Sequence, residues 1–234
     1  MSNHSIRIGV MAPSTCSYLA NQEESVAVVL DPELHTDRGY GFLVQSGFRR
    51  SGNNIYRPYC NACTACHSLR VDTRGFVPSR SQKRHLSQLK RLCIEFKDQM
   101  DTDWFSLYER YISARHRHGS MYPANKQDFR SFVQSDWQTS KYLHLYEDEK
   151  LIAIAITDIL ENGYSAIYSF FEPDHCWSLG SLCVLAQIEQ ARKHGIPWLY
   201  LGFQIDACSA MNYKQKFKPH QRYVAGSWID GDQF

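Results

Sequence analysis

The sequence predicts an α/β (α+β) fold for its 234 residues. Near residue 140 the spacing of apolar residues changes from helical to strand-like, which indicates helices before that point and a sheet after it. A further helical segment separates a fourth strand from the first three, which is the order of a mixed sheet with one parallel crossover. With 43% hydrophobic residues, a chain of this length can bury a substantial core without disulfides.

Two regions of different character divide the chain. Residues 1–78 are irregular and rich in Gly, Asn, Arg and Cys, and we expect them to pack against a domain that spans 79–234. That domain is expected to begin with a basic helix over 79–97 and to continue with helices within 101–135, because apolar residues recur there at helical spacing. Its sheet and last helix are expected over 141–207.

Short links separate the predicted strands. "KYLHLYED", "KLIAIAITDIL" and "YSAIYSFFEP" follow one another with tight connections, which favours an antiparallel meander. The next helix has Ser178 as its expected N-cap and Gly195 just beyond its end, and Pro197 prevents its continuation. "PWLYLGF" then completes the sheet as the fourth strand.

This order of strand, strand, strand, helix and strand resembles the core of the GNAT-type acyltransferases. In those enzymes two strands splay apart, and the N terminus of the intervening helix receives the acyl donor. The glycine-rich loop that grips coenzyme A in that family is degraded here, because "CWSLGSL" supplies one glycine and no Arg or Gln at its front. We therefore expect a GNAT-like core in the C-terminal half, with a donor other than coenzyme A.

Positive charge is concentrated in one block of the chain. Between Arg38 and Arg91 there are 11 Lys or Arg residues and one acid, Asp72, so the block carries +10, whereas the remaining 15 basic and 23 acidic residues give −8. Nine of the 11 cations are arginines, whose planar guanidinium matches phosphate oxygens, and aromatic residues are interleaved with them. The block predicts binding of a polyanion, with a solvated basic face as the alternative.

Three cysteines stand at an even spacing in "RPYCNACTACHSLRV": Cys60, Cys63 and Cys66. They could bind zinc or an iron–sulfur cluster, with Cys16 or His67 as the fourth ligand. The alternative is that these small, soft side chains pack a crowded core or act as redox-sensitive thiols. The sequence leaves both interpretations open.

Polar residues interrupt the apolar second half at two places. Asp158 lies within "IAIAITDIL", where a carboxylate is stable only if it is paired or serves a site. Glu172 stands in the passage from the third strand to the last helix. The first amides of that helix, near Leu179 and Gly180, can receive an anion or a developing oxyanion.

Segments spread in order along nearly the whole chain resemble the aminoacyl-tRNA–protein transferases. They include "CSYL", "SGFRRSGNNIYRPYCNACTACHSLRV", "FVPSRSQKR", "YISARHRHG", "TDILENGYSAIYSFFEPDHCWSLGS" and "LYLGFQIDACSAMNYKQKFKP". The likeness is strongest to the bacterial branch of this family. It implies transfer of leucine from leucyl-tRNA to an N-terminal Asp or Glu of an acceptor protein, which marks that protein for N-degron (N-end rule) degradation. Eukaryotic relatives use arginyl-tRNA.

The cysteines depart from the eukaryotic pattern of this family. Those relatives carry a Cys-x-x-Cys near the start, whereas here Cys16 is followed by Leu19 three residues later. They also carry a later Cys-Cys pair, where this chain has the ladder from Cys60 to Cys66. An iron–sulfur site of the eukaryotic kind is therefore not carried over intact, and the implied chemistry requires no cofactor.

The reaction implied by the resemblance suggests roles for individual residues. An amine attacks the ester of an aminoacyl-tRNA, which requires alignment, a proton acceptor and an oxyanion donor. We expect Asp158 or Glu172 to hold or deprotonate the amine, and amides near Leu179 and Gly180 to receive the oxyanion. The cations expected to bind the acidic acceptor residue are Arg49, Arg50, Arg57 and Arg70. The residues expected to contact tRNA are Arg80, Lys83, Arg84, Arg115, Tyr213 and Lys214.

Partners and compartment follow from the same reasoning. No apolar run approaches the roughly 20 residues that cross a bilayer, and the start of the chain lacks the layout of a signal peptide. We expect a cytoplasmic protein that meets aminoacyl-tRNA and acceptor proteins but neither membrane nor DNA. An arginyl-tRNA donor with the same acceptors, or a non-enzymatic, metal-stabilised RNA-binding protein, are the alternatives.

Overall fold

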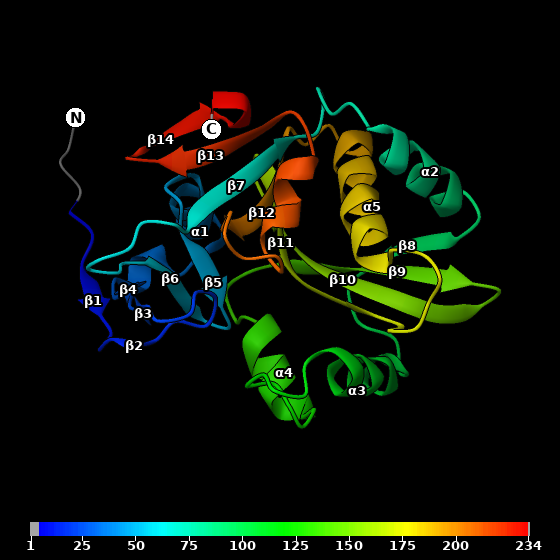
Figure 1. The fold of residues 1–234 in the computed structure, drawn as a ribbon, viewed down its shortest axis with the longest axis horizontal. Helices are drawn as coiled ribbons and strands as arrows, with labels where there is room; N and C mark the ends of the chain where they lie inside the picture. The colour runs from blue at the N-terminus through cyan, green and yellow to red at the C-terminus, as the bar shows by residue number, and fades with distance from the viewer. Residues whose placement is uncertain (1–4, 234) are drawn as a thin grey trace.

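The computed structural model describes residues 5–233, which form a mixed α/β fold built on a large sheet (Figure 1). The strands of this sheet are β7 (His67–Asp72), β8 (Cys93–Lys97), β9 (Ser140–Glu147), β10 (Lys150–Leu160), β11 (Gly163–Phe171), β12 (Trp198–Gln204), β13 (His220–Val224) and β14 (Ser227–Asp230). Their order is β14-β13-β7-β12-β11-β10-β9-β8. None of the helices within residues 5–233 is long and apolar enough to cross a membrane.

A smaller sheet lies at the N-terminal end of the molecule (Figure 1). Its strands, in spatial order, are β1 (Ile8–Val10), β4 (Val26–Val29), β6 (Asn54–Pro58) and β5 (Arg49–Ser51). The ribbon of β2 (Ser14–Thr15) and β3 (Glu23–Glu24), the 3-10 turn η1 (Pro32–Leu34) and helix α1 (Asp37–Gln45) complete this region. Since β7 pairs with both β12 and β13, the region before residue 79 also supplies an inner strand of the large sheet.

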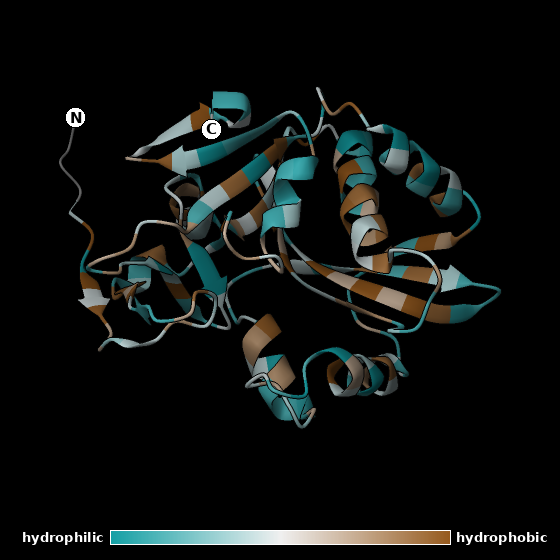
Figure 2. Ribbon diagram, viewed as in Figure 1, coloured by the Kyte–Doolittle hydropathy of each residue, from teal (hydrophilic) through white to brown (hydrophobic). Residues whose placement is uncertain are grey.

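Helices cover both faces of the large sheet (Figure 1). The remaining elements are α2 (Arg80–Leu89), α3 (Trp104–Arg115), α4 (Lys126–Val133), α5 (Leu179–Lys193), η2 (Asn212–Lys216) and η3 (Gly231–Gln233). Helices α2 and α5 pack on one face with Ala153 and Ala155 of β10, whereas α3 and α4 pack on the other with Ile154 and Ile156. Both faces of β10 are therefore buried, which explains its continuous apolar run over residues 151–156 (Figure 2).

The predicted meander and crossover are confirmed. Strand β10 pairs antiparallel with β9 and β11, with Ile154 opposite His144 and Phe170, and β11 pairs in parallel with β12. Helix α5 begins at Leu179 and ends before Gly195, whose φ of +70° is a conformation that glycine adopts without strain. The mixed sheet and its order match the GNAT-like core that the sequence predicts.

The predicted helix over 79–97 is wrong in its second half. Helix α2 starts with a capping box between Ser79 and Gln82 and ends at Leu89. The chain then forms β8, an edge strand paired with β9. Its apolar residues alternate, because Ile94 and Phe96 pack against the core while Cys93 is exposed, so the segment carries a helical period followed by a strand period.

Strands β11 and β12 pair over a short stretch and then separate. The parallel register runs from Gly163 opposite Trp198 to Ser165 opposite Tyr200. Beyond that point β12 continues against β7 after a bulge, in which Gly202 has a φ of +78°. The C-terminal part of β11 has no partner on this side, so the sheet opens into a wedge between the two strands.

Candidate functional site

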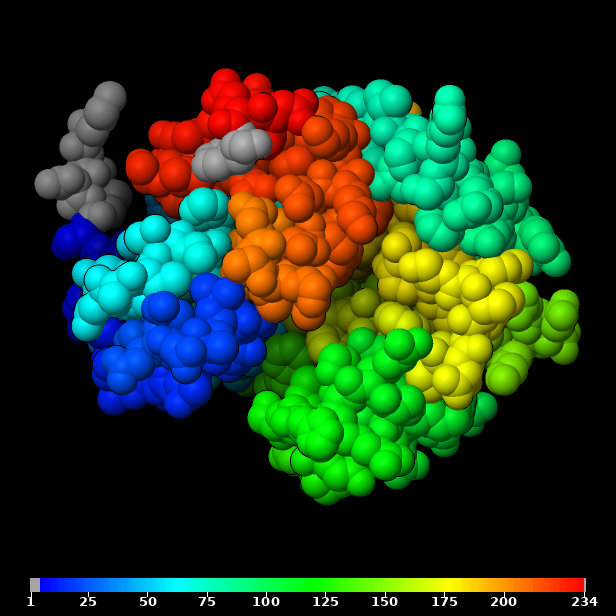
Figure 3. Space-filling model, viewed as in Figure 1, coloured from blue at the N-terminus to red at the C-terminus, as the bar shows by residue number. Residues whose placement is uncertain are grey.

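The wedge between β11 and β12 opens into a hollow on the molecular surface. In Figure 3 the hollow is surrounded by the orange segment that contains η2, the green helices α3 and α4, and the yellow segment that leads into α5. Strands β10 and β11 lie at its floor. Side chains from elements far apart in the sequence therefore meet at one opening.

Arg49 fills the apex of the wedge. From β5, its Nη1 donates a hydrogen bond to Ser165 Oγ at 2.7 Å and its Nη2 donates to the carbonyl of Ala166. Ala166 is the residue of β11 just past the last pair with β12. On the other side, a Cβ added to Gly202 would lie 3.3 Å from Arg49 Nε, so the guanidinium packs against the backbone of β12. Arg49 is 7% exposed.

Lys214 occupies the β12 side of the same wedge. Its Nζ donates to the carbonyl of Phe203 and lies 3.4 Å from Met211 Sδ, and the residue is 5% exposed. Burial, and then the nearby Arg49 guanidinium, lowers the pKa of Lys214 to about 7. Helix η2 (3-10) thus folds the Lys214 side chain inward, and its contact with tRNA stays a prediction.

Asp158 and Arg50 form a buried ion pair. Arg50 Nε donates to Asp158 Oδ2 at 2.7 Å and Nη2 to Oδ1 at 2.5 Å, and neither side chain is exposed. Ser140 Oγ also donates to Asp158 Oδ1 at 2.7 Å. The predicted roles of Asp158 in catalysis and of Arg50 in acceptor binding are wrong, since no substrate can reach either group. Of the two alternatives for Asp158, the structure supports the ion pair.

Glu172 directly follows β11, at the start of the segment that leads into α5. Arg110 of α3 donates to its Oε2 from Nη2 at 2.9 Å and from Nε at 3.2 Å, and the Glu172 side chain is 19% exposed. The carboxylate is thus held in place by one cation while it keeps contact with solvent. It can hold an ammonium group or accept a proton from it.

The two predicted oxyanion donors differ in availability. The amide of Leu179 donates to the carbonyl of Trp177 at 2.9 Å, so it is already occupied. The amide of Gly180, in the first turn of α5, makes no hydrogen bond within the described residues and lies beside the ring of Phe171. Because the positive end of the helix dipole adds to the effect, Gly180 is the better placed donor for a developing anion.

Aromatic side chains line the α3 side of the opening, which sequence analysis missed. The rings of Tyr111 and Phe171 lie 4.8 Å apart between centroids, and Tyr168 follows on β11 beyond the split. Burial, and then the neighbouring Tyr213 and Cys183, raises the pKa of Tyr111 to about 12. The Tyr111 hydroxyl is therefore uncharged at neutral pH. In the sequence these aromatic residues occur at ordinary helical and strand spacing, so they cannot be distinguished from residues of the hydrophobic core.

The other two arginines predicted to bind the acceptor lie outside the wedge. The Arg57 guanidinium lies over the ring of Phe48 at 4.9 Å. Arg70 lies between Trp198 at 3.8 Å and Trp228 at 4.3 Å, and its Nη2 donates to Gln221 at 2.7 Å. Stacking on aromatic rings and a side-chain amide account for both positions.

The residues predicted to contact tRNA separate into exposed and engaged groups. Arg80, Lys83 and Arg84 are exposed on α2, which packs against α5. Tyr213 is 37% exposed. Arg115 donates from Nη2 to the carbonyl of Pro173 at 2.5 Å and so braces the segment that leads into α5. The basic surface of α2 thus adjoins the helix whose first turn lies at the opening.

All four predicted metal ligands line one cavity of about 660 Å³: Cys16, Cys60, Cys63 and Cys66. Burial, and then the other three thiols, raises the pKa of Cys66 to about 12. In the part of the chain that the structure describes, no group of three or more His, Cys, Asp or Glu side chains is arranged to hold a metal ion. The thiols do not fit a metal in this arrangement.

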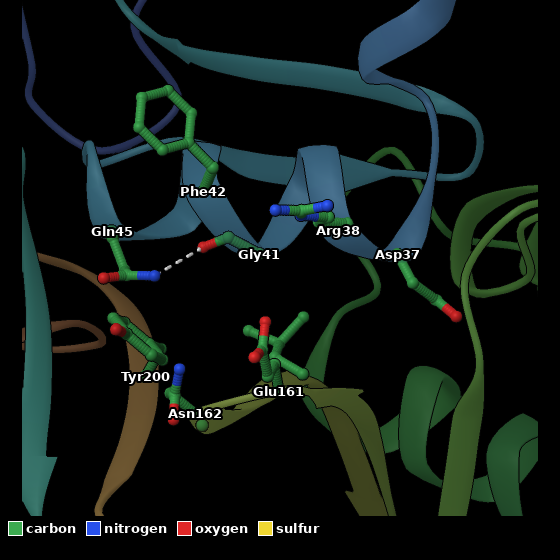
Figure 4. Close-up of a pocket in the computed structure, with 10 residues that line it drawn as sticks. Asp37, Arg38, Gly41, Phe42, Gln45, Glu161, Asn162 and Tyr200 are labelled. Carbon is green, nitrogen blue, oxygen red and sulfur yellow. Dashed lines mark hydrogen bonds between the residues drawn. The ribbon is translucent and has the colours of Figure 1, made fainter.

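A second, smaller cavity of about 140 Å³ lies at the turn between β10 and β11. Figure 4 shows Gln45 of α1 on the side of Glu161 and Asn162 of that turn, whereas the ring of Phe42 points away from them. Gln45 Nε2 donates to the carbonyl of Gly41 at 3.2 Å, so its amide is partly engaged within the helix. Tyr200 of β12, which pairs with Ser165 at the end of the parallel stretch, also lines this cavity.

Comparison with known proteins identifies the relatives of this chain. The family of arginine-tRNA-protein transferases matches it twice, with its N-terminal part over residues 14–84 and its C-terminal part over 103–224. An aspartate/glutamate leucyltransferase from Vibrio cholerae is 51% identical over 224 residues, which covers 95% of this chain and 96% of that protein. Proteins with the same name from Vibrio parahaemolyticus and Aeromonas salmonicida are 50% and 44% identical, again over at least 95% of this chain and 96% of theirs. Among solved structures, a domain of a putative lysylphosphatidylglycerol synthetase from Agrobacterium fabrum reaches a TM-score of 0.47 at 14% identity, covering 85% of this chain and 70% of that one.

Proposed function

The chain belongs to the arginine-tRNA-protein transferase family, and from that premise we propose that it acts as an aspartate/glutamate leucyltransferase. It moves leucine from leucyl-tRNA to the amino terminus of a protein that begins with Asp or Glu. This proposal rests on a sequence identity of 50–51% to proteins with that name, over nearly their whole length. Charged tRNA is a cytoplasmic substrate, so we place the reaction in the cytoplasm.

The split sheet supports an acyl transfer. The α-amine of the acceptor, with an ordinary pKa near ~7.7–8.0, is partly neutral at neutral pH and attacks the ester carbonyl of leucyl-tRNA. The tetrahedral oxyanion then expels the ribose oxygen, which takes up a proton, while the amine loses one. Alignment of the two substrates supplies much of the acceleration, on the order of 7–11 kcal/mol.

Two groups at the opening suit this chemistry. The Gly180 amide donates to the oxyanion, and the adjoining helix dipole stabilises the negative charge. Glu172, oriented by Arg110, holds the acceptor ammonium and receives its proton. Asp158 takes no part, since it is locked on Arg50.

A leucine donor suits the walls of the opening better than an arginine donor. Tyr111, Tyr168 and Phe171 offer an uncharged surface to the donor side chain. An arginine side chain would find no charge partner among these three rings. The basic surface of α2 is the expected contact for the tRNA, through Arg80, Lys83 and Arg84.

Mass spectrometry of peptides tests the proposal directly. Peptides that begin with Asp, Glu, Lys or Arg are incubated with the protein and either leucyl-tRNA or arginyl-tRNA. The expected result is a gain of one leucine on the Asp and Glu peptides alone. A gain of arginine would establish the other donor, and no modification of any peptide would contradict the proposed activity.

Glu172→Gln tests the proposed role of the carboxylate. The variant is expected to lower kcat for leucine transfer at least tenfold, because the amine loses its proton acceptor. Glu161→Gln, at the exposed turn between β10 and β11, is the matched control and should retain wild-type kcat. Equal rates for both variants would remove Glu172 from the mechanism.

A further inference from the structure

The apex of the wedge holds two buried cations on opposite strands. Arg49 bonds the carbonyl of Ala166 on β11, and Lys214 bonds the carbonyl of Phe203 on β12. They come from β5 and η2, which are more than 160 residues apart in the sequence. The two are close enough for Arg49 to lower the pKa of Lys214. Each therefore binds the backbone of one of the two separating strands.

Neither cation has a carboxylate partner. Their hydrogen bonds go to neutral groups only: backbone carbonyls, the hydroxyl of Ser165 and the sulfur of Met211. Within residues 5–233 no Asp or Glu forms an ion pair with Arg49 or Lys214.

The other buried cations described below, in contrast, do have carboxylate partners. Arg50, the next residue along β5, donates hydrogen bonds to both carboxylate oxygens of Asp158. Arg222, also buried, is bonded by the two oxygens of Asp206. In both cases a buried guanidinium that has a structural role is paired with a carboxylate. The apex of the wedge is an exception, and it lies at the functional opening.

Electrostatics indicates what the apex is suited to bind. Burial, and then repulsion by the Arg49 guanidinium, disfavours the charged form of Lys214 and lowers its pKa. An anion placed between them would restore the proton to Lys214 and form charge-assisted hydrogen bonds to both groups. A carboxylate matches this need, because it carries one negative charge and two acceptor oxygens.

Building on the proposed function, we propose that Arg49 and Lys214 bind the side-chain carboxylate of the acceptor's first residue. Both cations are nearly buried, so the ligand must be small and carried on a narrow chain, as the Asp or Glu side chain of a peptide is. A tRNA phosphate is flanked by riboses and is bound instead by exposed cations such as those on α2. Recognition at the apex would place the acceptor amine in the opening, on the same side as Gly180.

The inference is tested by equilibrium binding of two peptides that differ only in their first residue, Asp or Asn. Wild-type protein is expected to bind the Asp peptide at least tenfold more tightly, since only Asp offers a carboxylate. Lys214→Met should reduce this ratio towards one, and Lys214→Arg, which keeps the charge, should retain most of it. Lys216→Met, an exposed lysine two residues further along η2, should leave the ratio unchanged.

Several results would overturn the inference. Equal binding of the two peptides by the wild-type protein would contradict the inference. This comparison needs no variant, so it does not depend on whether Lys214→Met folds. A ratio that persists in folded Lys214→Met, verified by circular dichroism, would exclude Lys214. Because the readout is binding, its failure is distinguishable from failure of the proposed function, which is measured as leucine transfer in the same preparation.

Discussion

The guanidinium of Arg50 and the carboxylate of Asp158 form two hydrogen bonds, of 2.7 and 2.5 Å, with both side chains excluded from solvent. The pair joins the small N-terminal sheet to β10 at the centre of the large one. Arg50 also donates to the carbonyl of Val133 at the end of α4. One residue therefore connects three parts of the fold.

Asp158→Asn is expected to destabilise the protein by about 3–5 kcal/mol, because it leaves the Arg50 charge buried without a partner. Urea unfolding measures the change in the free energy of unfolding. The double variant Arg50→Met/Asp158→Leu should be more stable than Asp158→Asn, since it removes both charges. Full stability with lost transfer in Asp158→Asn would instead restore Asp158 as a catalytic residue.

The exposed cations of α2 are expected to govern the salt dependence of tRNA binding. Replacing both Arg80 and Arg84 with Ala should lower the slope of log K against log salt concentration by about 2, roughly one for each lost phosphate contact. Lys150→Ala, at the exposed turn between β9 and β10, is the control and should leave the slope unchanged. Filter binding over a range of salt concentrations gives these slopes, and an unchanged slope in the double variant would remove α2 from the tRNA contact.

Gly202→Ala is expected to disturb Arg49 as well as the backbone. A Cβ at Gly202 would approach Arg49 Nε at 3.3 Å, and the φ of +78° strains any L residue by about 1–2 kcal/mol. Gly195→Ala is the matched control, because Gly195 also has a positive φ but open space around its Cβ. Both variants should lose similar stability in thermal unfolding, whereas only Gly202→Ala should weaken binding of an Asp-initiated peptide. Equal peptide binding by both would show that Arg49 tolerates the added methyl.

Lys214 is expected to make the free protein more stable as pH rises above neutrality. Its pKa is lowered to about 7 in the folded protein and returns to about 10.4 on unfolding, so between these values the unfolded chain binds more protons. The free energy of unfolding should therefore gain up to about 1.4 kcal/mol per pH unit from pH 7 towards 10. Subtracting the pH profile of Lys214→Met isolates this contribution, and parallel profiles would contradict the buried amine.

The thiols are expected to react with iodoacetamide in a fixed order. Cys93 and Cys176 are exposed and should be alkylated first, whereas burial raises the pKa of Cys66 and Cys183 to about 12 and should make them slowest. Peptide mapping by mass spectrometry gives the rate at each position. If added zinc were to slow alkylation of Cys16, Cys60 and Cys63 as well, the cysteine cavity would bind metal after rearrangement.

The sequence was most informative where a pattern is local. The alternation within 140–171 predicts three paired strands, and Ser178 and Gly195 predict the limits of α5 within one residue. The segment 79–97 shows the limit of this reasoning. Helical spacing of Leu86 and Leu89 is genuine, but pairing with β9 rather than local propensity decides the conformation from Cys93 onward.

The order of strands and helix within 140–207, the segregation of charge into the block before residue 92 and the family could all be predicted from the sequence, because each is encoded in neighbouring residues or in motifs of fixed order. The role of each cation, in contrast, depends on the tertiary structure. Arg49 and Arg50 are adjacent in the chain, yet strand geometry points them to opposite faces, and one meets Asp158 while the other enters the wedge beside Lys214. Burial and partners come from segments more than 100 residues away, so a list of charged residues cannot separate a structural ion pair from a binding site.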